Sequence, residues 1–259
     1  MKMILLLMFF AILPMLGFAG IKTETVEYAD GKTVLEGYLA WDDATPGERP
    51  GILVVHEWTG LGDYVKGRVR QLAGMGYVAF AADIYGKGIR PQSPEEAGKE
   101  AGIFKNDRAL TRSRINAALA QLLKNKKVDP KRVAAMGYCF GGMVVLELAR
   151  SGASVAGVVT FHGSLDTPTP ADSKNIKAKV LALQGGDDPY VPAAARQAFE
   201  EEMRSGGVDW QMVVYGGAVH AFTNPAAGSD PGKGAAYNER ADRRSWEAMG
   251  RFFEEIFKR

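Results

Sequence analysis

Residues 133–150 read VAAMGYCFGGMVVLELAR, and Cys139 within them is the one cysteine of the 259-residue chain. The apolar residues from Val133 to Tyr138 predict a buried strand, and those after Gly142 predict a helix. Glycines on both sides of the cysteine permit a sharp turn between the two elements. We therefore expect Cys139 at a helix N-terminus, where unpaired amides and the helix dipole favour a thiolate.

The spacing around Cys139 matches the G-x-S-x-G nucleophile elbow, with a thiol in place of the serine hydroxyl. A strand, a tight turn and a helix are the context that this motif needs. A lone cysteine can equally be a small buried apolar residue in a turn without chemistry. The motif alone leaves both interpretations open.

The composition indicates a globular chain with a sizeable core, because 46% of the residues are apolar and 24% are charged. The formal net charge is +2, from 32 basic and 30 acidic residues. The sequence has no basic stripe with interleaved aromatic residues, so we expect no nucleic-acid partner. The length suits one domain over residues 20–259, which we expect to be a monomer.

Residues 1–19 have the pattern of a secretory signal peptide. Lys2 supplies the positive charge, Ile4 to Leu16 is apolar, and cleavage is expected after Ala19. The alternative is an uncleaved anchor helix, but a bilayer takes about 20 apolar residues. We expect an exported protein, periplasmic or secreted, with no stable membrane anchor after cleavage.

Export makes the unpaired cysteine informative, because an odd cysteine in a secreted protein suggests a reactive thiol or an intermolecular link. The three histidines, His56, His162 and His220, have no zinc-site spacing with it. We therefore expect no metal site.

The remaining pattern is a hairpin followed by alternating strands and helices. Asp30-Gly31 is the turn between strands expected at 23–28 and 33–41. The further strands are expected at Gly51–His56, Tyr77–Ala82, Val133–Tyr138, Val155–Phe161, Val180–Gln184 and Trp210–Tyr215. The helices are expected at Asp63–Met75, Ser93–Ile103, Asp107–Asn125, Gly142–Arg150, Ala193–Ser205 and Tyr237–Phe257, with a surface loop at Asn224–Ala236. This order predicts an α/β fold with a mostly parallel sheet, an N-terminal antiparallel hairpin and helices on both faces.

Two strand exits carry possible partners for the thiol. Asp187 and Asp188 follow the strand ending at Gln184, and His220 follows the strand ending at Tyr215. The order nucleophile, acid, histidine is the one in which this elbow acquires its catalytic partners. Each residue alone could be ordinary, since aspartates are common in turns. The ordered set favours a catalytic group, with Asp187 or Asp188 as the acid.

The same elbow requires two backbone donors for an oxyanion. The residue after the nucleophile, Phe140, supplies one N–H. The loop after the strand ending at His56 supplies the other, and we expect the donor to be the amide of Trp58.

Five segments together resemble the dienelactone hydrolase family over roughly residues 22–257. They are His56-Glu57-Trp58-Thr59-Gly60, Ala82-Asp83-Ile84-Tyr85-Gly86, Gly137-Tyr138-Cys139-Phe140-Gly141-Gly142, Gly185-Gly186-Asp187-Asp188-Pro189-Tyr190-Val191-Pro192 and His220-Ala221-Phe222. The resemblance implies an α/β-hydrolase fold and hydrolysis of a small ester or lactone without a cofactor. It also implies Asp188 as the acid and Glu57 as a carboxylate that pairs with the resting nucleophile.

The chain departs from this family where a substrate carboxylate would be held. The resemblance implies two arginines, but Lys87 and Asn224 stand at the matching positions. Lysine keeps the charge but loses the bidentate fork, and asparagine has no charge. Arg90 is a possible substitute, and Tyr85 is a further candidate substrate contact. A dienelactone is therefore a doubtful substrate.

The predicted mechanism has Asp188 orienting His220, His220 accepting the thiol proton, and Cys139 forming a thioester that water hydrolyses. Two alternatives remain at this point. One is a non-catalytic binding protein on the same fold, and the other is a thiol acyltransferase. We also expect Glu57 to protect the resting thiol from oxidation.

Overall fold

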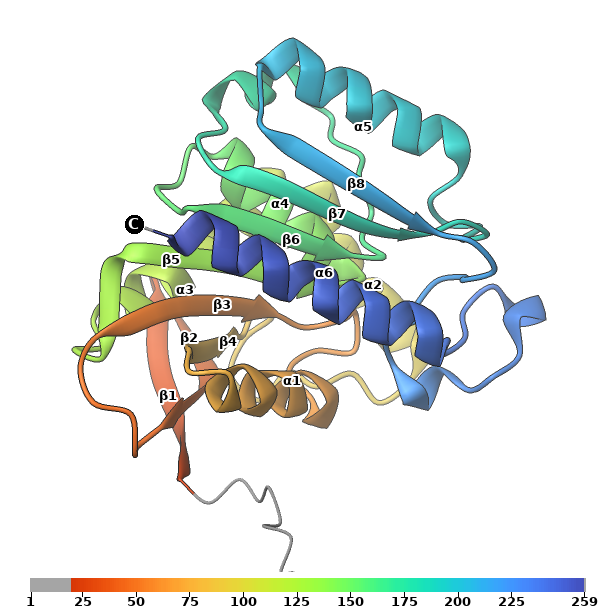
Figure 1. The fold of residues 1–259 in the computed structure, drawn as a ribbon. Coiled ribbons are helices and arrows are strands. Elements are labelled where there is room, and N and C mark those ends of the chain that lie inside the picture. Colours follow the sequence, from red (N-terminus) through yellow and green to blue (C-terminus); the bar gives the residue numbers. More distant parts are fainter. Residues whose placement is uncertain (1–19, 259) are drawn as a thin grey trace, which may run out of the picture.

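The computed structural model describes residues 20–258, which are built around one eight-stranded sheet in the order β1-β2-β4-β3-β5-β6-β7-β8 (Figure 1). The strands are β1 (Ile21–Asp30), β2 (Thr33–Asp42), β3 (Arg49–Val55), β4 (Val78–Ala82), β5 (Val128–Tyr138), β6 (Gly157–Phe161), β7 (Lys179–Gly185) and β8 (Trp210–Tyr215). The signal peptide expected at residues 1–19 lies outside the described residues.

The sheet is antiparallel at one edge and parallel elsewhere. Strands β1 and β2 form the hairpin around Asp30-Gly31, and β2 runs antiparallel to β4. From β4 through β8 every neighbouring pair is parallel. The carboxyl ends of six strands therefore meet at one edge, where loops can bring side chains together.

Six helices cover the two faces of the sheet (Figure 1). They are α1 (Asp63–Gly74), α2 (Pro94–Asn106), α3 (Arg108–Leu123), α4 (Phe140–Arg150), α5 (Ala193–Gly206) and α6 (Glu239–Phe257). Helices α1 and α6 share one hydrophobic core with the sheet, and α2 to α5 share the other. The predicted fold class, an α/β sheet with an antiparallel N-terminal pair, is confirmed.

The two cores follow from the two-residue period of the strands. In β3, Leu53 and Val55 belong to the core under α2 to α5, whereas Ile52 and Val54 belong to the core under α1 and α6. A strand covered on both faces must be apolar at every position, which explains the continuous run in the sequence.

Capping side chains set the first residues of α3 and α6. Asp107 accepts a hydrogen bond from the amide of Leu110 and so begins α3 directly after α2 ends. Asn238 accepts from the amide of Ala241, so α6 begins at Glu239 and not at the predicted Tyr237. Each cap satisfies an amide that has no acceptor within its helix.

Strand β5 begins at Val128, five residues before the predicted start at Val133. Val128 and Asp129 pair with Arg49 and Pro50, after which the register shifts. Polar residues at this irregularity interrupt the apolar pattern, so apolar periodicity does not predict the first part of the strand.

The loop predicted at residues 224–236 contains two short 3-10 turns, Pro225–Ala227 and Pro231–Lys233. It folds back on the chain after β8, because the amide of Ala236 donates to the carbonyl of His220 at 3.0 Å. The loop therefore covers the segment that carries His220.

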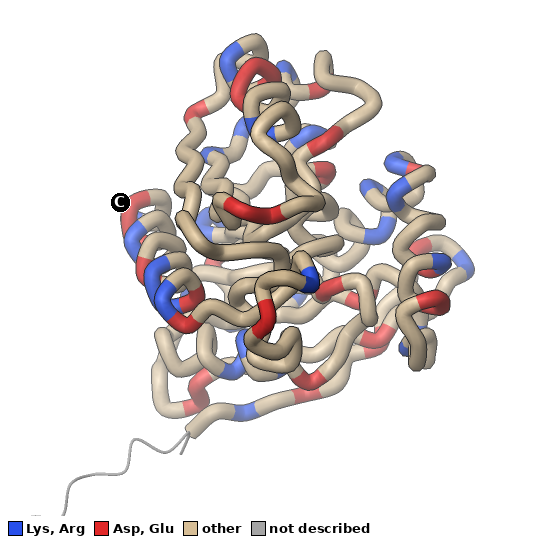
Figure 2. The backbone as a smooth tube through the Cα atoms, turned by 90° about the vertical axis from the view of Figure 1, so that its right-hand side faces the viewer, with Lys and Arg blue, Asp and Glu red and all other residues tan. Residues whose placement is uncertain are grey.

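Acidic and basic residues are interspersed along the described backbone, and both kinds alternate on α6 (Figure 2). Among residues 20–258, no helix is long and apolar enough to cross a membrane. The same residues contain no group of three or more His, Cys, Asp or Glu side chains placed to hold a metal ion.

Candidate active site

Cys139 occupies a strained turn between β5 and α4. Its backbone has φ 53° and ψ −116°, a conformation that L-residues rarely adopt. Its amide donates to the carbonyl of Phe161 on the neighbouring strand at 3.0 Å. A Cβ atom on Gly137 would lie 2.1 Å from the carbonyl oxygen of Gly141, so only glycine permits this close turn. The thiol itself is half-buried.

The chain brings His220 and Asp188 into direct contact. Nδ1 of His220 lies 2.9 Å from Oδ2 of Asp188, and the other carboxylate oxygen accepts from the amide of Tyr190 at 2.8 Å. Asp188 is buried, whereas the side chain of Asp187 points to solvent. Asp188, the acid that the family resemblance implies, is thus the aspartate that faces the histidine.

His220 also forms a hydrogen bond with Cys139. Burial of the imidazole lowers its pKa, but the hydrogen bonds to Asp188 and Cys139 outweigh burial and raise the pKa of His220 to about 10. A protonated imidazole beside the sulfur stabilises a thiolate. The three side chains form one continuous hydrogen-bonded series from carboxylate to sulfur.

The two backbone amides expected to donate to an oxyanion belong to Phe140 and Trp58. Helix α4 begins at Phe140, so the amide of this residue has no intrahelical acceptor. Trp58 follows β3 in a turn closed by the Gly60 amide and the Glu57 carbonyl at 3.1 Å. The Trp58 carbonyl accepts from the hydroxyl of Tyr85 at 2.8 Å, which fixes the orientation of its peptide group. Tyr85 therefore supports the Trp58 loop and is itself buried.

Glu57 is paired with Asn224. Oε2 of Glu57 accepts from Nδ2 of Asn224 at 2.5 Å. Burial raises the pKa of Glu57, while the hydrogen bond from Asn224 and the charges of His220 and Arg68 lower it, and the net shift is upward. The expected pairing of Glu57 with Cys139 stays a prediction, since here the thiol bonds to His220.

The other candidate substrate contacts are engaged elsewhere. Lys87 is exposed and forms an ion pair with Glu27 on the outer strand β1. The guanidinium of Arg90 donates to the carbonyl of Ile89 at 2.7 Å and lies 3.8 Å from Glu36. Neither residue contributes an unpaired cation beside Cys139.

Behind His220 lies a buried group of side chains that the sequence did not reveal. Arg68 of α1 donates to the carbonyl of Thr223 at 2.9 Å and to Asp242 of α6 at 2.5 Å. The hydroxyl of Thr223 in turn bonds to Tyr64 at 2.7 Å and to His162 at 2.8 Å. The sequence signal that could have found this group is the position of His162 directly after a strand.

The third histidine, His56, is a neutral structural residue. Its Nε2 accepts from the amide of Ile84 at 3.3 Å, so Nδ1 carries the proton and donates to the carbonyl of Glu57 at 2.6 Å. Burial lowers the pKa of His56 to about 4. The imidazole thereby ties the Glu57 loop to the end of β4.

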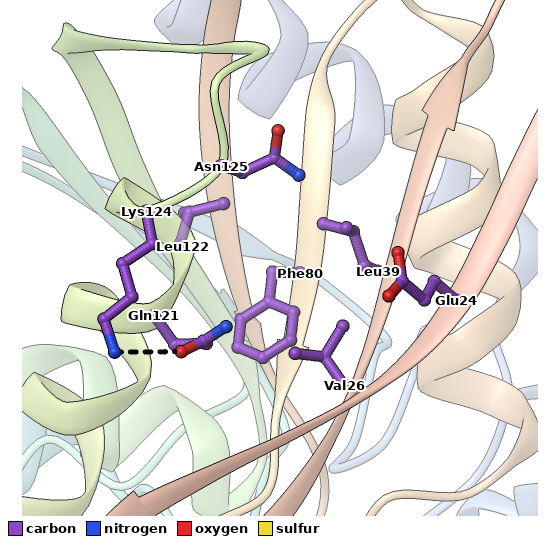
Figure 3. Close-up of a pocket in the computed structure, with 8 residues that line it drawn as sticks. All are labelled: Glu24, Val26, Leu39, Phe80, Gln121, Leu122, Lys124 and Asn125. Carbon is purple, nitrogen blue, oxygen red and sulfur yellow. Dashed lines mark hydrogen bonds between the residues drawn. The ribbon is translucent and has the colours of Figure 1, made fainter.

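Two surface hollows lie away from these residues. One, of about 170 Å³, is lined by β1, β2, β4 and the end of α3 (Figure 3). Within it Lys124 bonds to Gln121 at 3.3 Å. The other lies between β8 and α6. Neither is lined by Cys139, Asp188 or His220.

Known proteins share this architecture. The model of the dienelactone hydrolase family matches residues 35–257. A candidate carboxymethylenebutenolidase of Aquifex aeolicus (strain VF5) is 29% identical over 241 residues, covering 91% of this chain and 99% of that protein.

Two solved structures are also similar over nearly the whole chain. The structure named m3DLH has 42% identity and a TM-score of 0.89, with 92% of this chain and all of that chain covered. A dienelactone hydrolase-like promiscuous phosphotriesterase from metagenomic libraries has 40% identity and a TM-score of 0.87, with 92% of this chain and 100% of that chain covered. The family model spans both the Cys139 turn and the His220 loop, and the chain is a hydrolase that belongs to the dienelactone hydrolase family.

Proposed function

We propose that the protein cleaves a carboxylic ester or lactone through a thioester formed on Cys139. One observation carries the proposal: Asp188, His220 and the strained Cys139 are joined by hydrogen bonds in the order that a nucleophile, its base and an orienting acid require. The family membership supplies the hydrolase activity, and the geometry supports the roles proposed for the three residues.

In the proposed acylation, the Cys139 thiolate attacks the acyl carbon and a C–S bond forms. The carbonyl π electrons move to oxygen, where the amides of Phe140 and Trp58 donate to the oxyanion. The oxyanion then collapses, the C–O bond to the leaving group breaks, and His220 gives its proton to the departing alkoxide. The alcohol leaves, and the acyl group remains on sulfur as a thioester.

Deacylation uses the same residues in the reverse order. Neutral His220 takes a proton from water, whose oxygen attacks the thioester carbon. The second oxyanion collapses, the C–S bond breaks, and the thiolate is restored beside the protonated imidazole. Asp188 holds Nδ1 of His220 throughout, so that Nε2 faces the sulfur and the water.

The charges around the site favour a substrate without a negative charge. Lys87 and Arg90 are engaged by Glu27, Glu36 and backbone carbonyls, and Asn224 brings no charge. Glu57 places a carboxyl group against the segment that follows His220, because it accepts from the side chain of Asn224. An anionic acyl group there meets a like charge and no free cation from these residues. We therefore propose neutral esters or lactones as substrates.

A second candidate substrate class is the neutral phosphotriester, because a structural relative 40% identical to this chain is named a promiscuous phosphotriesterase. A phosphotriester has no negative charge, in keeping with the proposed preference for neutral substrates. Attack of the Cys139 thiolate on phosphorus would form a P–S bond and break the P–O bond to the leaving group, which would take its proton from His220.

A panel of p-nitrophenyl esters, lactones and a p-nitrophenyl phosphotriester tests these proposals with wild type, Cys139→Ala and Cys139→Ser. We expect Cys139→Ala to lose turnover and wild type to accumulate an acyl adduct detectable by mass spectrometry. Full activity of Cys139→Ala overturns the proposal. Transfer of the acyl group to added alcohol in preference to water indicates an acyltransferase, and binding without turnover indicates a binding protein.

We further propose that the mature chain is exported after removal of residues 1–19. N-terminal sequencing of the protein from periplasmic and cytoplasmic fractions tests this directly. A mature protein that begins at Gly20 supports cleavage, whereas an intact Met1 on the mature protein contradicts it.

A further inference from the structure

Backbone strain marks His162, whose ring lies next to that of the proposed base, His220. Within the described residues 20–258, three residues other than glycine have a positive φ: Cys139 at 53°, Ala221 at 55° and His162 at 40°. Cys139 is the proposed nucleophile, and Ala221 follows His220. Strained residues persist where the surroundings hold them, and they concentrate at functional sites. The strain at His162 therefore indicates a role at this site.

His162 is fixed by both its backbone and its ring. Its amide donates to the carbonyl of Leu183 on β7 at 2.8 Å. The preceding residue, Phe161, accepts the amide hydrogen of Cys139. The His162 ring lies 5.1 Å, centroid to centroid, from His220 and from Phe222, edge to face in both cases. The last residue of β6 and the residue after it thus contact the turn of the nucleophile and the ring of the base.

A series of hydrogen bonds behind His220 runs from Arg68 to His162. Arg68 has donors and no acceptor, so its Nε, 3.3 Å away, donates to the hydroxyl of Tyr64. Tyr64 then gives its proton to the Thr223 hydroxyl at 2.7 Å. The Thr223 hydroxyl also forms a hydrogen bond of 2.8 Å with Nε2 of His162. Burial keeps the His162 imidazole neutral.

Arg68, the first residue of this series, is held in place by several side chains. The guanidinium of Arg68 lies 5.4 Å from the centre of the Tyr64 ring and 5.0 Å from that of Trp246, within the range of cation–π attraction. Asp242 of α6 completes its charge pairing at 2.5 Å. Because Arg68 and Tyr64 also contact the carbonyl of Thr223, they fix the loop that begins at His220.

We propose that His162, oriented by the Thr223 hydroxyl, is a positioning residue that holds the His220 imidazole in line with Cys139 and Asp188. The inference rests on the proposed role of His220 as the base. A neutral ring suits this position, since a second positive charge 5.1 Å from His220 would oppose its protonation. Burial and the charge of His220 keep the pKa of His162 well below its usual range.

Two variants remove the proposed orientation in different ways. His162→Phe keeps an aromatic ring but loses the nitrogen that forms a hydrogen bond with Thr223. Thr223→Val keeps the shape of the side chain but loses the hydroxyl, whereas Thr223→Ser restores the hydroxyl. Thr111→Val is the matched control, because Thr111 is equally buried and its hydroxyl donates to the carbonyl of Phe104, away from the site.

We expect His162→Phe and Thr223→Val each to lower kcat about 10- to 100-fold with KM nearly unchanged, as a misplaced catalytic group does. The double variant should lose little more than either single variant, because both changes break the same hydrogen bond. Thr223→Ser should recover most of the activity. Thr111→Val should keep the wild-type kcat even if its melting temperature falls.

Two further readouts separate positioning from a structural defect. The pH profile of Cys139 alkylation by iodoacetamide reports the Cys139–His220 pair without any substrate. The proton that Asp188 and His220 share gives a far-downfield proton NMR signal. Both should change in His162→Phe and Thr223→Val and return in Thr223→Ser.

The inference is overturned if His162→Phe and Thr223→Val keep the wild-type kcat, alkylation profile and downfield signal. His220→Ala distinguishes this result from failure of the proposed function. If His220→Ala is inactive while the His162 and Thr223 variants are normal, His220 is the base but His162 does not position it. If His220→Ala is fully active, the proposed function itself fails.

Discussion

Nδ2 of Asn224 lies 2.5 Å from Oε2 of Glu57, and this hydrogen bond joins the loop after His220 to the loop after β3. The two residues are 167 positions apart in the chain. The contact holds the carboxyl group of Glu57 at the proposed site. The family resemblance implies an arginine at position 224, where this chain has the uncharged amide of Asn224. The preference for neutral over anionic substrates should therefore depend on Glu57.

Glu57→Gln should narrow the preference for neutral over carboxylate-bearing esters by about 10-fold, because it removes a like charge near the acyl group. Glutamine keeps the oxygen that accepts from Asn224. The ratio of kcat/KM for two p-nitrophenyl esters of equal size, one neutral and one anionic, measures the effect. Glu27→Gln is the control, since Glu27 pairs with Lys87 on the outer strand. An unchanged ratio in Glu57→Gln would contradict the proposed repulsion.

Asp188→Asn should make the stability of the protein less sensitive to alkaline pH. The pKa of His220 in the folded protein, about 10, is above its ordinary value of 6.5. The protonated imidazole therefore contributes stability that is complete below pH 6.5 and is lost as pH rises through about 10. Asparagine removes the carboxylate that helps to raise the pKa of His220. The melting temperature of Asp188→Asn should therefore fall less between pH 7 and pH 10 than that of wild type.

The matched control for this experiment is Asp187→Asn, which removes the adjacent exposed carboxylate. Its melting temperature should follow the wild-type curve across the same pH range. Asp188→Asn should also lower kcat by at least about 100-fold, because the orienting acceptor for Nδ1 of His220 is lost. Parallel melting curves for Asp188→Asn and wild type would show that the His220 pKa is not set by Asp188.

Acid should destabilise the protein through its buried neutral histidines. Burial lowers the pKa of His56 from 6.5 to about 4, so the unfolded chain binds a proton there that the folded chain does not. Stability is therefore lost as pH falls from 6.5 towards 4, by about 1–3 kcal/mol for one such group. His56→Gln should reduce the loss, measured by urea unfolding at pH 7 and pH 4.5. An equal loss in the variant would assign acid sensitivity to other groups.

Much of the site could be predicted because its chemistry is tied to strand ends. The parallel sheet brings the residues after β5, β7 and β8 to one edge, so Cys139, Asp188 and His220 could be placed without coordinates. The strand exits alone did not separate Asp187 from Asp188; the family resemblance implied Asp188, in agreement with the side-chain directions. Those depend on the turn that the Tyr190 amide closes on Asp188, which no periodicity encodes.

The contacts behind His220 could not be predicted, because they join residues that only the tertiary fold brings together. Arg68 and Thr223 are 155 positions apart, and Arg68 on an amphipathic helix is indistinguishable from a solvated arginine. The same limit applies to Lys87, whose pairing with Glu27 depends on the course of β1. Patterns within a segment locate strands and their exits, but not the partners of a charged side chain.

Gly141→Ala should disrupt the turn that presents Cys139. An added Cβ would lie 2.5 Å from the carbonyl oxygen of Val55 on β3, so the backbone of α4 or of β3 must move. Overpacking of this kind costs about 1–3 kcal/mol, and displacement of the Phe140 amide should lower kcat as well.

Gly98→Ala is the matched control, because Gly98 lies within α2 and its added Cβ meets nothing within 4 Å. Alanine there should raise the free energy of unfolding by about 0.5–1 kcal/mol and leave kcat unchanged. A Gly141→Ala protein with wild-type stability and kcat would show that the close approach of α4 to β3 is not required.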